Sequence, residues 1–177
     1  MNERDLRYPI GRRPDLDPSD EAVRRDAIAS IAGHPAKLRA VVSGLSVAQL
    51  DTPYRDGGWT ARQVVHHLAD SHLHAYLRCT WALTEDGPTI KGYDPAVWAD
   101  IPDARSGPVE PSLTLLDGLH QRWVARFASL DAGDFERAWT HPTQGRRITI
   151  GDTLLTYAWH GDHHLAHIEV AKHRHDG

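Results

Sequence analysis

The chain has 177 residues, a formal net charge of −4, and 40% hydrophobic and 25% charged residues, which is typical of one globular domain and excludes a largely disordered or collagen-like chain. Lys and Arg are not clustered, so the electrostatic footprint of a nucleic-acid-binding protein is missing. No run approaches the roughly 20 apolar residues of a membrane span, and the first residues lack the apolar stretch of a signal peptide. The single cysteine, Cys79, excludes an internal disulfide and a cysteine-rich zinc site. We therefore expect one cytoplasmic domain over residues 1–177, with neither a membrane nor a nucleic acid as its partner.

The first third of the chain predicts an irregular arm followed by a helix. Prolines and a glycine punctuate residues 1–18 and oppose regular structure there. Asp20 or the serine before it can cap a helix that runs to about residue 32. Pro35 is expected to interrupt this helix and, as a first-turn proline, to start a continuation to about residue 42.

Two capping-box patterns follow. Residues 46–49 (Ser-Val-Ala-Gln) predict a single short turn, and residues 51–58 are rich in turn residues and predict a loop. Residues 60–63 (Thr-Ala-Arg-Gln) form the second capping box, and apolar residues recur at helical spacing after it. We predict a helix over residues 60–85.

The next segment is punctuated by Gly, Pro and Asp. Residues 86–110 predict a long loop with one turn near residues 95–100. A proline then starts a helix over about residues 111–130, and residues 131–136 add a further turn.

Residues 138–150 break the helical pattern and predict a small hairpin with its tip at Gln144-Gly145. Asp152 suits the first turn of a last helix that runs to about residue 173. Four long helices in one chain indicate an all-α four-helix bundle, with the irregular arm before it and the hairpin ahead of its last helix.

Histidine is unusually frequent, with 13 residues, and eight of them fall into two groups on predicted helices. Imidazole is the commonest metal ligand and the usual acid or base near neutral pH. The first group comprises His66, His67, His72 and His74, and the second comprises His160, His163, His164 and His167.

The last helix offers a pair of ligands. His160 and His164 are four residues apart, so their side chains share one helix face and can converge on one cation. His167 continues the same stripe, whereas His163 lies about 100° around the helix from His164. Gly161 follows His160 where a zincin helix has its catalytic glutamate, so the zincin mechanism is excluded.

The helix that begins near residue 60 carries a matching stripe with His67 and His74. Periodicity hardly separates His67 from His66 as a third ligand, although His66 is the more solvent-facing of the two in this pattern. His72 falls in the apolar stripe and is expected to be a core histidine bonded to a neighbouring carbonyl. A third imidazole on a second helix gives weight to a metal site, because three protein ligands and an open position are the layout of catalytic zinc.

Several segments together resemble one family. Residues 50–72, LDTPYRDGGWTARQVVHHLADSH, are similar to the signature of the YfiT-type proteins in the DinB-like superfamily. The similarity extends to Tyr8-Pro9-Ile10-Gly11, to Trp159-His160 and to the segment from His163 to Ile168. It covers nearly the whole chain.

The resemblance implies a four-helix bundle that holds one divalent metal per chain through His67, His160 and His164. It thereby selects His67 over His66. Zinc is the expected metal, with nickel as the alternative, since imidazole suits both. The family also implies a cytoplasmic homodimer. Asp70 and His163, which flank the ligands, are the candidate catalytic helpers.

Members of the family are described as metal-dependent hydrolases, and relatives in the superfamily transfer small thiols of the bacillithiol type. A three-histidine centre lowers the pKa of a bound water toward 7, which suits a hydrolase. The same centre would deprotonate a bound thiol, which suits a thiol S-transferase. A non-catalytic metal-binding protein is the third interpretation, disfavoured because structural zinc normally has four protein ligands. We expect a small-molecule substrate, a low-molecular-weight thiol in the transferase interpretation.

Overall fold

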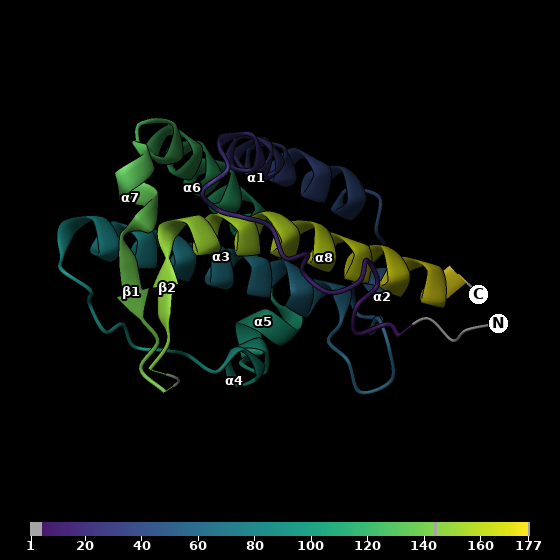
Figure 1. The fold of residues 1–177 in the computed structure, drawn as a ribbon. Coiled ribbons are helices and arrows are strands. Elements are labelled where there is room, and N and C mark those ends of the chain that lie inside the picture. The colour runs from purple at the N-terminus through teal and green to yellow at the C-terminus, as the bar shows by residue number, and fades with distance from the viewer. Residues whose placement is uncertain (1–4, 144, 177) are drawn as a thin grey trace.

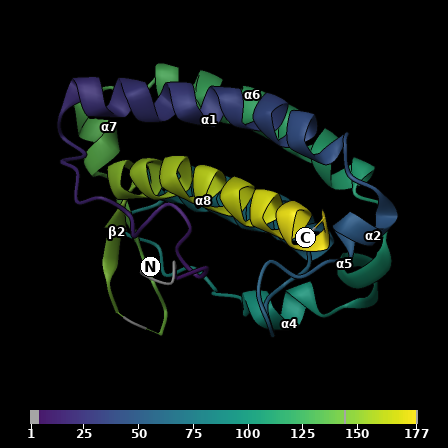
Figure 2. The same ribbon diagram turned by 90° about the vertical axis from the view of Figure 1, so that its right-hand side faces the viewer.

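Four long helices form the body of the protein in a computed structural model that describes residues 5–143 and 145–176. They are α1 (Glu21–Val42), α3 (Ala61–Thr84), α6 (Glu110–Ala128) and α8 (Ile150–Asp176). Helices α6 and α8 each pack against both α1 and α3, which closes a ring in the order α1, α8, α3, α6. Figures 1 and 2 show α1 and α6 together in one layer, and Figure 1 shows α8 in front of α3 in the other. The predicted four-helix bundle is confirmed.

The shorter elements lie at the ends and on one side of the bundle. They are α2 (Val47–Leu50), α4 (Pro95–Ala99), α5 (Pro102–Ser106), α7 (Ala132–Glu136), β1 (Ala138–Thr140) and β2 (Arg147–Thr149). Helix α4 occupies the predicted turn near residues 95–100, whereas α5 was not predicted. The one local signal for α5 is Pro102 at its first position, since Ile101, at its N-cap, makes no side-chain capping bond.

The hairpin ahead of the last helix is confirmed. Strands β1 and β2 pair antiparallel, with Trp139 opposite Ile148. At the predicted tip, Gly145 has a φ of +59°, which glycine adopts without steric cost. Gln144 lies outside the described residues.

Helix α3 starts where its capping box predicts. The Thr60 hydroxyl accepts from the Gln63 backbone N–H, and the Gln63 side chain accepts from the Thr60 N–H. Both bonds satisfy donors that a helix start leaves free. The phase of α3 places His67 on the face that packs against α8.

Helix α1 runs without interruption through Pro35, so the predicted break there is wrong. A proline inside a helix cannot bond to the carbonyl four residues earlier, here that of Ile31. Burial of this part of α1 maintains the helix, since Ile31, Pro35 and Leu38 are all buried. The Ile31 carbonyl accepts instead from His120 Nδ1 on α6, at 2.7 Å.

The bundle interior combines large apolar side chains with buried imidazoles. Two apolar clusters are centred on residues such as Trp123 and Leu154 in one and Leu68 and Leu116 in the other. The buried histidines are His34, His67, His72, His120, His163, His164 and His167. Over the described stretches of chain, no helix is long and apolar enough to cross a membrane.

The N-terminal arm is irregular over its described part, as predicted, because residues 5–20 form only turns, bends and unassigned backbone. The arm runs along α8 (Figure 1), and the Leu6 carbonyl lies 3.1 Å from His167 Nε2. The arm therefore reaches the histidine face of the last helix.

Candidate metal centre

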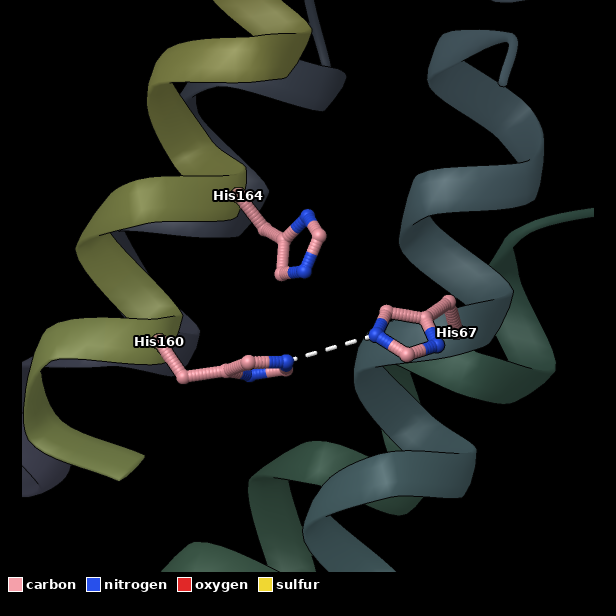
Figure 3. Close-up of side chains that lie close together, drawn as sticks. All are labelled: His67, His160 and His164. Atoms are coloured by element: carbon pink, nitrogen blue, oxygen red, sulfur yellow. Dashed lines mark hydrogen bonds between the residues drawn. The ribbon is translucent and has the colours of Figure 1, made fainter. Parts of the chain in front are cut away.

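Three histidines from two helices converge inside the bundle. His67 projects from α3, and His160 and His164 project from successive turns of α8 (Figure 3). One ligand nitrogen of each ring lies within 4.8 Å of the others. The pairing of α3 with α8 thus assembles the trio that the family resemblance implied.

The spacing within this trio matches a metal site. His67 Nε2 and His160 Nε2 are 3.3 Å apart. Two ligands of a tetrahedral zinc, each about 2.0–2.1 Å from the ion, are separated by about 3.3 Å. The ring of His164 stands 4.8 Å from the ring of His67 and 4.4 Å from that of His160, measured between centroids. The three imidazoles fit a single divalent cation.

The surroundings keep these imidazoles neutral. Burial lowers the pKa of His67 to about 4, and His167 adds to the shift. Burial also lowers the pKa of His160 and of His164 well below the ordinary value, and neighbouring imidazoles act in the same direction. Only a neutral ring has a free lone pair, so each of the three rings has one available at neutral pH.

Aromatic and hydroxyl side chains surround the trio. The Trp59 ring lies 4.8 Å from that of His67, and the Tyr157 ring lies 5.2 Å from that of His160. The Tyr157 hydroxyl is 3.2 Å from Ser71 Oγ. Burial raises the pKa of Tyr157, so its hydroxyl stays protonated at neutral pH.

A second trio comprises His163, His164 and His167, whose ligand nitrogens also lie within 4.8 Å of one another. His164 belongs to both trios. Its Nδ1 lies 3.2 Å from His167 Nδ1, which leaves its Nε2 for the first trio. The ring of His167 stacks on that of Tyr54, with 3.9 Å between the centroids, and its Nε2 bonds to the Leu6 carbonyl.

The two candidate helpers lie close to the ligands in sequence but make no bond to them in the described structure. His163 stacks on Trp159 at 4.3 Å, and its Nδ1 is buried without a hydrogen-bond partner among the described residues. The Asp70 carboxylate makes no hydrogen bond to His66 or His67 there either, and burial raises its pKa. Their catalytic roles stay predictions.

The neighbours of His67 on α3 point elsewhere. His66 is half-buried, with Nδ1 2.8 Å from Ser112 Oγ on α6, so its predicted solvent-facing position is wrong. His74 stacks on Tyr93 at 4.2 Å, and its Nδ1 contacts its own helix at the Asp70 carbonyl.

Sequence reasoning missed the imidazoles behind His160. His72 was predicted to bond to a carbonyl, but its Nε2 lies 3.2 Å from His160 Nδ1 and its Nδ1 lies 2.8 Å from His120 Nε2. His120 was not singled out. Its place in the apolar stripe of α6, between Leu116 and Trp123, is the signal that marks it as buried.

The comparisons with known proteins agree with this geometry. A family model described as the DinB superfamily matches residues 30–168, and the chain belongs to that superfamily. A relative from Geobacillus kaustophilus is 45% identical over 96% of this chain and 95% of its own length. A relative from Bacillus mycoides is 44% identical over 97% of this chain and 98% of its own length. Both are named "Putative metal-dependent hydrolase".

A solved structure shares the fold. YfiT from Bacillus subtilis is 42% identical and superimposes with a TM-score of 0.92 over 96% of this chain and 97% of its own. It is described as "a probable metal-dependent hydrolase with an unusual four-helix bundle topology". The expected family and bundle are confirmed, and by this similarity the chain groups with enzymes named for metal-dependent hydrolysis.

Proposed function

We propose that this protein is a metal-dependent hydrolase in which His67, His160 and His164 hold one divalent ion, zinc first and nickel as the alternative. The observation that carries the proposal is the convergence of three neutral imidazoles, two buried and His160 partly buried, at a spacing that fits one cation. The names of the relatives support the same activity.

The ligand set favours a catalytic site over a structural one. Among the described residues, the group containing His67 and His160 has three members, and three protein ligands are typical of catalytic zinc. When bound, a divalent ion supplies Lewis acidity that promotes deprotonation of water at neutral pH. The three neutral imidazoles would hold such an ion without cancelling its charge, and three protein ligands would leave room for a substrate.

A pocket beside α3 offers space for that substrate. It has a volume of about 450 Å³ and is lined in part by Arg78, Lys91 and Tyr93, within the range of small-molecule sites. Burial raises the pKa of Tyr93 to about 12, and the nearby Ser71 side chain partly offsets this rise. Ser71 in turn contacts Tyr157, whose ring packs on His160. Ser71 and Tyr157 therefore lie between this pocket and the trio.

Two cationic residues, Arg78 and Lys91, outnumber the single carboxylate of Asp94 in the lining of this pocket, which favours an anionic substrate. Arg78 Nε is buried without a hydrogen-bond partner in the described part of the chain, while its guanidinium lies 4.8 Å from the Trp139 ring. A carboxylate or phosphate on the substrate would supply the missing acceptor. Aromatic side chains at Trp81 and Trp98 line the same pocket and suit an apolar portion of the substrate.

A thiol S-transferase is the second candidate. The observation that favours it is that no carboxylate bonds to the three histidines among the described residues, so a general base for water is not evident. A thiol ionises far more readily than water and needs no such base. In that reaction the sulfur forms a bond to an electrophilic carbon while a leaving group departs with its electron pair.

One experiment separates these functions. The protein is stripped of metal, reloaded with one equivalent of zinc, and assayed on carboxylic ester and amide substrates and, separately, on cysteine with 1-chloro-2,4-dinitrobenzene. Zinc-dependent release of acid from an ester or amide supports the hydrolase. Zinc-dependent conjugation without hydrolysis overturns it in favour of the transferase. His160→Ala is the matched control, and absence of turnover in both assays supports a non-catalytic metal-binding protein.

A further inference from the structure

A line of imidazoles runs from the candidate metal centre across the bundle to α1. His160 Nδ1 lies 3.2 Å from His72 Nε2, and His72 Nδ1 lies 2.8 Å from His120 Nε2. His120 Nδ1 then lies 2.7 Å from the Ile31 carbonyl oxygen. His72 and His120 are fully buried. The line therefore connects α8, α3, α6 and α1 through three consecutive hydrogen bonds.

The carbonyl at the far end decides where every proton in this line sits. A carbonyl oxygen only accepts, so His120 Nδ1 is the donor. A neutral imidazole carries one ring proton, which makes His120 Nε2 an acceptor and His72 Nδ1 a donor. Because His72 carries its one proton on Nδ1, its Nε2 accepts, and His160 Nδ1 is the donor. His160 Nε2 is thereby left with a free lone pair, and this is the atom that faces His67.

The surroundings of His120 and His72 favour the neutral form of both rings. Burial lowers the pKa of His120, although the bond to Ile31 acts in the opposite direction. Burial lowers the pKa of His72 well below the ordinary value, and the imidazoles around it add to the shift. At pH 8 both rings are therefore neutral.

Pro35 creates the acceptor on which this line ends. In a regular helix the N–H of residue 35 would bond to the carbonyl of residue 31. Proline has no N–H, so the Ile31 carbonyl has no partner at that position of α1. His120 Nδ1 takes the place of the missing donor. The sequence pattern predicts that Pro35 breaks the helix. In the structure, Pro35 instead leaves the buried Ile31 carbonyl free to accept from His120.

The second ligand on α8 has the same arrangement with one imidazole fewer. His167 Nε2 lies 3.1 Å from the Leu6 carbonyl and is therefore a donor. His167 Nδ1 then accepts from His164 Nδ1 at 3.2 Å. His164 Nε2 is left as a free lone pair for the trio.

We propose that His72, His120 and His167 are positioning residues that hold His160 and His164 in the Nδ1–H tautomer, with Nε2 presented to the metal. The role of these residues in metal binding rests on the proposed function, whereas the hydrogen bonds between them do not. Groups that bond to the second nitrogen of a ligand imidazole typically change metal affinity about 10–100-fold. Here that partner is a chain of imidazoles whose direction a main-chain carbonyl sets.

The direct test is the tautomer of each ring in the metal-free protein. Long-range ¹H–¹⁵N correlation spectra at pH 8 distinguish protonated Nδ1 from protonated Nε2. The expected result is Nδ1–H for His72, His120, His160 and His164, and Nε2–H for His167. Protonated Nε2 on His160 or His72 would overturn the proposal, and this measurement needs no variant to fold.

The second test removes the end of the line. His120→Phe leaves His72 free to adopt either tautomer, so His160 should become a mixture and the zinc dissociation constant should rise about 10–100-fold. His34→Phe is the matched control, because His34 packs 5.5 Å from His72 and 5.6 Å from His120 and has no hydrogen-bond partner among the described residues. It should change zinc affinity by less than about threefold. Equal weakening by both substitutions would show a packing effect and overturn the proposal.

Two further outcomes separate this proposal from the proposed function. Zinc binding by a protein whose rings show the opposite tautomers would overturn the positioning role and leave the metal site standing. The expected tautomers in a protein that binds no zinc would support this orientation of the rings and overturn the metal function. Pro35→Ala restores a competing N–H for the Ile31 carbonyl and should shift the His120 and His72 signals without altering those of His167.

Discussion

Gly161 on α8 lies directly against the imidazole of His34 on α1. A Cβ atom built on Gly161 would stand 2.8 Å from His34 Nδ1, closer than a normal van der Waals contact. His34 is buried and its ring stacks on those of His72 and His120, so it has little room to move. The glycine that follows the ligand His160 is therefore required by the packing of two helices.

Gly161→Ala should destabilise the protein by about 1–2 kcal/mol. Forcing a methyl group into a packed interior costs about 1–3 kcal/mol, and the better helix propensity of alanine offsets part of this. Urea unfolding of the metal-free protein measures the change. Gly118→Ala on α6 is the matched control, because a Cβ there meets nothing within 4 Å, and it should be neutral or stabilising. A stable Gly161→Ala protein would contradict the close packing.

Removal of any ligand should abolish stoichiometric zinc binding. His67→Ala, His160→Ala and His164→Ala each leave two imidazoles, and metal content after dialysis should fall from about one zinc per chain to below about 0.2. His66→Ala removes the adjacent imidazole, which contacts Ser112 and not the trio, and should retain its zinc. Full occupancy in His160→Ala would remove these residues from the site.

Stability of the metal-free protein should fall as the pH drops from 6.5 toward 4.5. Burial, followed by His120 and Lys37, lowers the pKa of His34 to about 3, against about 6.5 in the unfolded chain. Between these values the unfolded chain binds more protons, so this stabilising contribution is complete above pH 6.5 and is lost as the pH decreases. His67, with a pKa of about 4, adds to the slope in the same direction.

Each such histidine contributes up to about 1.4 kcal/mol per pH unit in that window. Urea unfolding at pH 6.5, 5.5 and 4.5 measures the slope, and His34→Phe should reduce it by about one histidine's share. A slope that is unchanged in His34→Phe would show that this ring is already solvated or charged in the folded protein.

Arg78 should determine the preference for anionic substrates. If the hydrolase proposal holds, Arg78→Gln should raise the KM of a substrate that carries a carboxylate about 10–100-fold, since a charge-assisted hydrogen bond contributes about 1.5–3 kcal/mol. A neutral analogue should be hardly affected. Arg105→Gln removes an exposed arginine on α5 that pairs with Asp100, and serves as the control. Equal losses for both substrates would place Arg78 outside substrate recognition.

The sequence alone predicted the four long helices, apart from the continuity of α1 at Pro35, and two of the three candidate ligands. Capping boxes at Thr60 and Ser46 are local, because their bonds join residues three apart, and both appear where the pattern predicts them. The pair His160 and His164 is likewise fixed by helical spacing. The hairpin follows from a local change of period and a glycine turn.

Only the tertiary structure decided the rest, because it depends on which helices become neighbours. Periodicity could not choose between His66 and His67, since their positions relative to α8 and α6 are set by helix packing. It could not show that Pro35 lies within a continuous helix, because burial against α6 and α8 maintains α1 there. It could not align His72 with His120, since these residues come from different helices and their hydrogen bond exists only once α3 and α6 pack together.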